Sequence, residues 1–256
     1  MADDLVGRVA LVTGAGRGLG REIALGLARG ARVVLLARTQ PELDTVAAEI
    51  RATGGTAVAV AADVGDPLQA AAAVRRDAAQ LGEIGVLVNN AAVVWPLGPT
   101  AGLDPAAVSA ALSINVLGVI GLTSALLAPM TSAEWGRIVN VSSGIVSRPE
   151  MMIGGTVYAA GKAALEAHTV NLAAELAGTG VTVNAYRPGA VDTAMQEWIR
   201  SQPPEKIGTG LHERFMDSYT LGTLISPQRS AASLLARLSS EDTGRIWDVA
   251  DTEVPA

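Results

Sequence analysis

The sequence predicts an α/β protein with one doubly wound parallel sheet of about seven strands and helices on both faces. Short apolar runs of strand length alternate along the chain with longer segments of helical periodicity. Most of these runs are apolar throughout, which is typical of parallel strands buried on both faces. No internal repeat, low-complexity tract or linker interrupts the alternation, so we expect a single domain over residues 1–256.

The predicted elements follow one another in a regular order. Strands are expected over residues 8–13, 31–37, 56–61, 86–88, 137–141, 181–186 and 245–249. Helices are expected over residues 21–29, 41–53, 67–81, 105–130, 157–177 and 227–238. The periodicity breaks down over residues 191–226, and a long irregular segment in a compact domain is usually functional. We interpret it as a short helical lid over a substrate, with a small satellite core or a subunit contact as alternatives.

Composition excludes several classes of function. A net charge of −6 gives no basic surface for nucleic acid. The chain has no Cys and only two His, so we expect no disulfide, no thiol nucleophile and no metal site. The longest apolar segment, around residues 118–130, is too short to span a membrane, and the N-terminus lacks a signal-peptide pattern. We therefore expect a cytoplasmic protein that uses neither a membrane nor nucleic acid as a partner.

The first predicted strand runs directly into a glycine-rich turn. Thr13, Gly14, Gly18 and Gly20 match the spacing T-G-x-x-x-G-x-G, and a helix follows. This layout brings backbone N–H groups and a helix N-terminus up to a phosphate. The alternative is a glycine turn that holds no ligand.

The end of the second predicted strand bears on which dinucleotide would bind. An acidic residue there would bind the adenosine ribose 2′-hydroxyl and repel a 2′-phosphate, but Ala37 is followed by Arg38 and Thr39. Arg38, and Arg17 within the glycine turn, offer guanidinium groups suited to phosphate. Each arginine alone is open to interpretation as a solvated surface residue; together, with no acid present, they favour NADP over NAD.

Polar residues at the next strand ends complete a cofactor crevice. The Asp63 carboxylate, followed by Val64, is placed to accept from the adenine amino group, or else serves in a turn or a helix cap. We expect Asn89 to be mainly structural and the backbone of Asn90, Ala91 and Ala92 to touch the cofactor.

A Tyr and a Lys one helical turn apart supply candidate catalytic groups. Tyr158 and Lys162 share one helix face, and a cation beside a phenol favours the phenolate and lowers its pKa. Ser143, at a strand end, can bond a carbonyl oxygen that gains negative charge. This is the chemistry of moving a proton while a hydride moves elsewhere. The pattern Tyr-x-x-x-Lys alone is weak, since chance matches commonly pair a half-buried Tyr with a solvated Lys.

Asn115 stands alone among the apolar residues of the predicted helix over residues 105–130. Its side chain must find a hydrogen-bond partner, either a held water or a local carbonyl.

Taken together, these motifs resemble the classical short-chain dehydrogenase/reductase family, whose fold is Rossmann-like. The resemblance covers nearly the whole chain, in the correct order, from Thr13–Gly20 through Tyr158–Lys162 to Pro188, Gly189 and Thr193. It implies that Tyr158 is the general acid/base and that Lys162 lowers its pKa and bonds the nicotinamide ribose. It also implies that Ser143, the second of a serine pair, orients the carbonyl and that Asn115 holds a relay water.

The resemblance also implies a cofactor site for NADP(H) and a homotetramer or homodimer. The implied cofactor-binding residues are Gly14, Arg17, Gly18, Leu19, Gly20, Arg38, Thr39, Asp63, Val64, Asn90, Ala91, Ala92, Tyr158, Lys162, Pro188, Gly189, Val191 and Thr193. The interval between Ser143 and Tyr158 is about two residues longer than is typical of the family, so we expect residues 144–157 to be remodelled around the substrate.

The resulting prediction is an NADP(H)-dependent oxidoreductase that interconverts a ketone and a secondary alcohol. The candidate substrate-pocket residues are apolar or amphipathic: Val94, Trp95, Ile145, Met151, Met152, Met195 and Trp198. They favour a hydrophobic carbonyl substrate, such as a 3-oxoacyl thioester or a polyketide-like, terpenoid or aryl ketone, with Arg148 as the one candidate for holding a carboxylate. The alternatives are an NAD-dependent dehydrogenase of the same fold and a non-catalytic NADP(H)-binding sensor.

Overall fold

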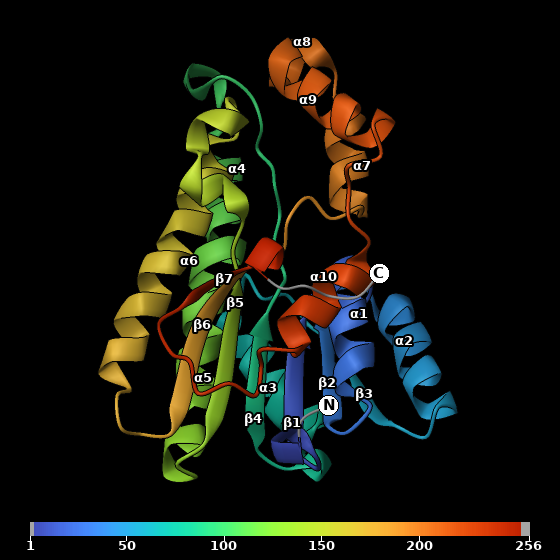
Figure 1. The fold of residues 1–256 in the computed structure, drawn as a ribbon, viewed down its shortest axis with the longest axis vertical. Coiled ribbons are helices and arrows are strands. Elements are labelled where there is room, and N and C mark those ends of the chain that lie inside the picture. Colours follow the sequence, from blue (N-terminus) through green and yellow to red (C-terminus); the bar gives the residue numbers. More distant parts are fainter. Residues whose placement is uncertain (1–2, 252–256) are drawn as a thin grey trace.

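The computed structural model has one parallel sheet of seven strands between two layers of helices (Figure 1). It describes residues 3–251, so residues 1–2 and 252–256 of the predicted domain lie outside the described range. The strands are β1 Val9–Thr13, β2 Arg32–Ala37, β3 Thr56–Ala61, β4 Ile84–Asn89, β5 Gly136–Val141, β6 Val181–Arg187 and β7 Ile246–Asp248. Each predicted strand is present, with bounds that differ by at most two residues, and the predicted fold class is confirmed.

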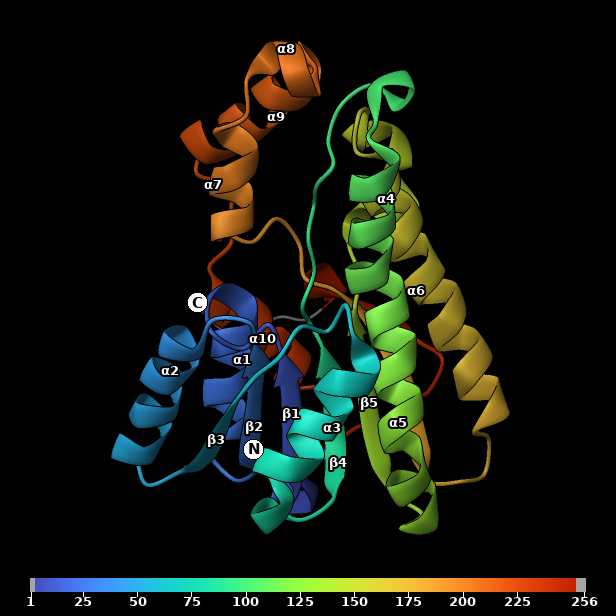
Figure 2. The ribbon, with the colours of Figure 1, turned by 180° about the vertical axis from the view of Figure 1, so that it is seen from behind.

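Helices cover both faces of the sheet because neighbouring strand residues point in opposite directions. Ala10 and Val12 of β1 pack under α1 (Gly18–Leu27), α2 (Gln40–Ala52) and α10 (Pro227–Leu235). Val9 and Leu11 pack on the opposite side, where α3 (Pro67–Asp77), α5 (Gly118–Ser132) and α6 (Thr156–Glu175) lie (Figure 2).

The strand order creates a crevice at one edge of the sheet. The order is β3-β2-β1-β4-β5-β6-β7, so the chain winds outward in one direction from β1 and in the other from β4. Ligands of open α/β sheets bind where the order reverses, outside the carboxyl ends of the strands. The glycine turn follows β1 and the Asn89–Ala92 stretch follows β4, so both line this switch point.

The long helix predicted over residues 105–130 is divided in the structure. α4 (Pro105–Leu112) and α5 are joined by a π-helical turn, Ser113–Leu117, which contains the buried Asn115. The segment Pro105–Ser132 contains an 18-residue window with a mean hydropathy of 2.0 and is long and apolar enough, by length and composition alone, to cross a membrane. The sequence analysis considered only residues 118–130 and judged them too short to span a membrane. The helical path is longer than expected because it continues through the π turn and past Pro129. In the fold it is a core helix, since Leu122, Leu126 and Met130 are buried against the sheet layer.

The segment predicted as a helical lid contains three helices beyond the carboxyl ends of the strands. They are α7 (Ala194–Arg200), α8 (Pro204–Ile207) and α9 (Thr209–Thr220), and they stand apart from the sheet in Figure 1. The two ends of the segment are held together where Val191 pairs with Ile225 in a parallel bridge. These helices contact the body through an apolar cluster in which Met152 and Val94 meet Ile199, Ile207 and Leu211.

Candidate active site

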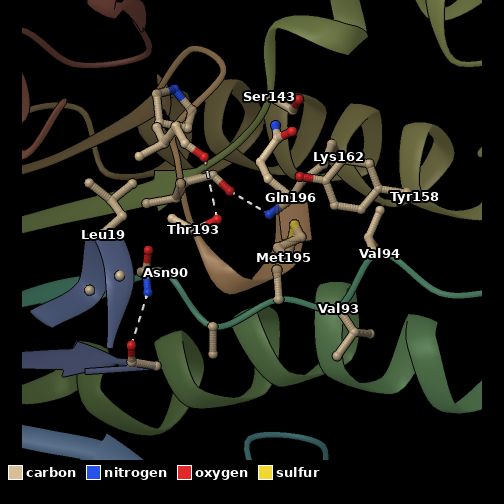
Figure 3. Close-up of a pocket in the computed structure, with 18 of the residues that line it drawn as sticks. Leu19, Asn90, Val93, Val94, Ser143, Tyr158, Lys162, Thr193, Met195 and Gln196 are labelled. Atoms are coloured by element: carbon tan, nitrogen blue, oxygen red, sulfur yellow. Dashed lines mark hydrogen bonds between the residues drawn. The ribbon is translucent and has the colours of Figure 1, made fainter. Parts of the chain in front are cut away.

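A cavity of about 910 Å³ lies at the switch point and extends under α7 and α9. Every predicted cofactor and substrate residue lines it, as do the predicted catalytic residues Ser143, Tyr158 and Lys162. Asn115 is the exception. The cavity therefore has a glycine-rich part and an apolar part; Figure 3 shows Leu19 and Asn90 on one side of it and Ser143, Tyr158 and Lys162 on the other.

The glycine turn leaves the first turn of α1 open toward this cavity. Arg17 precedes the helix in an extended conformation, and no side chain caps the helix N-terminus. A Cβ at Gly20 would overlap the Gly14 carbonyl oxygen, so the turn closes tightly only with glycine at that position. The uncapped N–H groups of Gly18, Leu19 and Gly20 are donors of the kind that hold a phosphate.

Hydrogen bonds tie the loop after β4 to the end of β1. Thr13 Oγ1 accepts from the backbone N–H of Asn90 at 2.9 Å and of Ala91 at 3.0 Å, and Asn90 Nδ2 donates to the Thr13 carbonyl at 2.9 Å. Asn89 is buried and donates to Asn140 Oδ1 at 2.9 Å and Thr123 Oγ1 at 3.2 Å, the structural role expected of it. The crevice walls are thus fixed relative to one another.

At the adenosine end of the crevice, the structure adds an acid that the sequence analysis missed. Arg17 and Arg38 both line the cavity. Glu42 in the first turn of α2 also lines it, and its Oε1 lies 3.7 Å from Arg17 Nη1. An acid in the first turn of a helix is ordinarily explained by its favourable interaction with the helix dipole. The sequence therefore offers no reason to assign Glu42 to the cavity. Asp63 lines the cavity as well, and its Oδ1 accepts from the Gly65 N–H at 2.8 Å, so its carboxylate is partly engaged in a turn.

Tyr158 and Lys162 project from α6 toward Ser143 at the end of β5 (Figure 3). Lys162 is 2% exposed, and its Nζ donates to the Val141 carbonyl at 2.6 Å. The same Nζ lies 5.7 Å from the centroid of the Tyr158 ring. The three groups therefore border one point in the cavity, as helical spacing predicted.

The electrostatics of this cluster differ from the expectation that Lys162 lowers the pKa of Tyr158. Burial raises the pKa of the Tyr158 phenol to about 12, while a hydrogen bond with Ser143 acts in the opposite direction. Burial also lowers the pKa of the Lys162 amine to about 8. Desolvation dominates because the Lys162 side chain is buried and Tyr158 packs on the apolar cluster, while the amine is bonded to a backbone carbonyl and faces the phenol ring. The phenol is thus fully protonated at neutral pH.

Asn115 lies behind the cavity wall instead of in it. Its Oδ1 accepts from the Val93 N–H at 2.8 Å and its Nδ2 donates to the Val93 carbonyl at 2.7 Å. The π turn brings the side chain to this backbone pair, which lies immediately before the pocket residue Val94. Of the two partners considered for it, the observed one is a backbone carbonyl; a role in holding water stays a prediction.

The cavity-lining segment that follows β6 is held by an ion pair between Arg187 and Glu166, which the sequence analysis did not predict. Glu166, one helical turn beyond Lys162, accepts from Arg187 Nε and Nη2, both at 2.8 Å, and from Ser142 Oγ at 2.8 Å. Arg187 directly precedes Pro188 and Gly189, which line the cavity. The pair therefore links the ends of β5 and β6 to the helix that carries the candidate catalytic residues.

Comparison with known proteins identifies the family. The family model described as short chain dehydrogenase matches residues 8–204. The chain belongs to the short-chain dehydrogenase family. Its curated relatives include the oxidoreductase UcpA of Escherichia coli K12, 37% identical over 252 residues that cover 94% of this chain and 92% of that one. A 3-oxoacyl-[acyl-carrier-protein] reductase of Synechocystis is 37% identical over 215 residues, covering 78% and 80%.

Solved structures of similar proteins superpose on nearly the whole chain. A 3-oxoacyl (acyl-carrier-protein) reductase from Agrobacterium tumefaciens with NADP bound has a TM-score of 0.81 and 31% identity, covering 95% of this chain and 93% of that one. A 3-ketoacyl-(acyl-carrier-protein) reductase from Brucella melitensis complexed with NADH has a TM-score of 0.80 and 31% identity, covering 96% and 97%. Both nicotinamide dinucleotides thus occur among similar structures.

In this short-chain dehydrogenase, the predicted substrate-pocket residues line the apolar half of the cavity together with residues of α7 and α9. These helices contribute Phe215, Arg214 and Gln196, which the sequence analysis did not select. Gln196 Oε1 is buried without a hydrogen-bond partner, and Figure 3 places the residue beside Met195 at the pocket. These residues lie in the aperiodic segment, so no spacing rule could have assigned them to the pocket.

Proposed function

We propose that this oxidoreductase interconverts a ketone and a secondary alcohol with NADP(H), and that ketone reduction is the favoured direction. The observation that carries the proposal is the convergence of Ser143, Tyr158 and Lys162 on the cavity that also contains the glycine turn. The order of these motifs along the chain is that of the family.

The residues present fit a dinucleotide. The uncapped start of α1 suits the pyrophosphate, the glycine turn leaves room for its close approach, and Arg38 and Arg17 suit a 2′-phosphate. The stretch from Pro188 to Thr193 would hold the nicotinamide, and the Lys162 amine would bond its ribose. The bound dinucleotide supplies the hydride in the reducing direction.

The chain's own residues then handle the oxygen. Ser143 donates a hydrogen bond to the carbonyl oxygen and keeps it near Tyr158, whose hydroxyl gives up its proton to that oxygen as negative charge develops there. A phenol with a pKa of about 12 is protonated throughout the neutral range, so Tyr158 is in the form that can donate a proton, as ketone reduction requires. Apolar residues around the reacting carbon exclude water.

An NAD-linked dehydrogenase is the alternative that a specific observation favours. Glu42 places negative charge beside Arg17 and so opposes a 2′-phosphate. With Arg38 included, the net charge at this end of the cavity is still positive, because the two guanidinium groups of Arg17 and Arg38 outnumber the one carboxylate of Glu42. Replacing Arg38 by alanine tests the choice: NADPH affinity should fall at least tenfold with NADH affinity unchanged, and an unchanged NADPH affinity would assign the enzyme to NAD.

We also infer a cytoplasmic homo-oligomer. Leu117 in the π turn before α5, Ile120 on α5 and Val170 on α6 expose apolar side chains, as a face that packs against a second copy of the chain would. Sedimentation velocity should give a dimer or tetramer, and a monomer at micromolar concentration would contradict this inference. Cell fractionation tests the location.

The catalytic assignment is tested with two variants at the same cavity. Replacing Tyr158 by phenylalanine should abolish turnover while leaving NADPH binding intact, because it removes only the hydroxyl. Replacing Ser143 by alanine should lower kcat by a factor of about 100, the order seen when one oxyanion donor is lost. Normal turnover by the Tyr158 variant would refute the mechanism.

A further inference from the structure

Two arginine side chains line the substrate half of the cavity from opposite walls. Arg148 lies between the two short 3₁₀ turns Gly144–Ser147 and Pro149–Met152, on the body of the protein. Arg214 lies on α9 of the lid. The two come from segments more than sixty residues apart, so the fold alone brings them to one cavity.

Both arginines are exposed residues that border the same cavity, and their like charges act on each other there. The pKa of Arg214 is lowered, first by burial and then by the charge of Arg148. Arg148 is flanked by Ile145 and Met152, and Arg214 by Phe215. All three apolar neighbours belong to the cluster that also contains Tyr158. The arginines thus stand at the rim of the apolar compartment into which the candidate proton donor points.

The positive charge of this pair is not neutralised within the described part of the chain. Between residues 3 and 251, neither Arg148 nor Arg214 forms an ion pair or a side-chain hydrogen bond. The exposed acids nearest in sequence, Glu150, Glu213 and Asp217, form none with them. By contrast, the guanidinium of Arg187 is paired with Glu166, and that of Arg200 stacks on the ring of Tyr219.

We propose that Arg148 and Arg214 together bind an anionic group, a carboxylate or a phosphate, at the far end of the substrate whose carbonyl reaches Tyr158. The inference rests on the proposed reductase function and narrows its substrate class. The substrate is then an amphipathic keto anion: a carbonyl, an apolar stretch along Ile145, Met152 and Phe215, and a charged end. This revises the expectation of a purely hydrophobic ketone.

The arrangement also gives the anion a part in closing the site. Guanidinium forks match carboxylate and phosphate oxygens, and one fork lies on the body while the other lies on the lid. An anion between them replaces a repulsion with two attractions, so it draws α9 toward the Gly144–Met152 segment. A neutral substrate of the same length makes the apolar contacts and lacks this link.

The kinetic test uses straight-chain methyl ketones that end in a carboxylate, at graded chain lengths, each paired with its methyl ester. We expect the keto acid of suitable length to have the lower KM, and the Arg148→Gln and Arg214→Gln variants each to raise that KM about five- to tenfold with kcat nearly unchanged. The esters should be unaffected. Lys206→Gln, which removes an exposed charge from α8 of the lid, is the matched control and should behave as wild type. Equal KM values for acids and esters, or equal effects of the variants on both, overturn the proposal.

A binding test keeps the anion site separate from the reaction. Trp95 and Trp198 line the cavity, so their fluorescence reports occupancy by octanoate, octyl phosphate or methyl octanoate in the presence of NADPH. We expect one or both anions to bind more tightly than the ester and to lose that advantage in the two arginine variants; which anion binds better separates carboxylate from phosphate. Absent turnover of every ketone with intact octanoate binding refutes the reductase function alone. Octanoate or octyl phosphate binding no tighter than the ester refutes the anion site alone.

Discussion

Replacing Lys162 by methionine should stabilise the cofactor-free protein near pH 7 while abolishing turnover. The Lys162 side chain is 2% exposed, and its burial lowers the pKa of the amine from 10.5 to about 8. Below pH 8 the amine is charged in both the folded and the unfolded chain, so folding must take a charge out of water. Methionine fills a similar volume and carries no charge.

The size and the pH dependence follow from the two pKa values. A difference of about 2.5 units corresponds to about 3 kcal/mol of unfavourable free energy at pH 7. Because the folded pKa lies below the unfolded one, the unfolded state binds more protons between pH 8 and 10.5, and wild-type stability rises with pH through that window. The advantage of the methionine variant should therefore shrink by about 2 kcal/mol between pH 7 and about pH 9.5. The variant also loses the hydrogen bond to the Val141 carbonyl, worth about 1 kcal/mol. This loss lowers its stability at both pH values by a similar amount, so the difference between the two pH values is unaffected.

Urea unfolding at the two pH values measures this change directly. Lys206, the other lysine of the sequence, is exposed, so Lys206→Met serves as the control and should track wild type at both pH values. A Lys162→Met variant whose stability relative to wild type is the same at pH 7 and at pH 9.5 would refute the reasoning from burial.

Three further substitutions probe the cofactor crevice and its support. Glu42→Gln should tighten NADPH binding about three- to fivefold and leave NADH binding unchanged, because it frees Arg17; weaker NADPH binding in a fluorescence titration would contradict this. Gly20→Ala should weaken both dinucleotides more than about tenfold, since its Cβ would overlap the Gly14 carbonyl, with a circular dichroism spectrum like wild type; unchanged affinities would show that the turn adapts. Glu166→Gln should lower the free energy of unfolding by about 3 kcal/mol, because the Arg187 guanidinium loses its buried partner; an unchanged urea midpoint would argue against the pair.

What the sequence could predict was governed by local spacing. Apolar runs bounded by turn residues located every strand of the sheet, and the glycine turn and the Tyr158–Lys162 interval identified two parts of the crevice from the sequence alone. Each of these signals lies within a few residues along the chain. The geometry of a helix or a tight turn converts such spacing into position.

Groups that meet only through tertiary structure escaped the same reasoning. Glu42 reads as an ordinary helix acid until α2 is placed beside the glycine turn, and Arg214 belongs to an aperiodic segment. The pKa of Tyr158 was predicted in the wrong direction because spacing gives proximity to Lys162 but says nothing of burial, which decides the shift.

The measurement that tests the central claim most directly is NADPH oxidation by wild type and by Tyr158→Phe on a panel of ketones that includes the keto acids and their esters. Equilibrium NADPH binding is measured in parallel for both proteins. We predict that wild type reduces at least one ketone, with NADPH preferred over NADH, and that the variant binds NADPH normally and reduces none. Equal turnover by both proteins would contradict the role of Tyr158 as proton donor. A wild type that binds NADPH and reduces no ketone on the panel would contradict the reductase function itself.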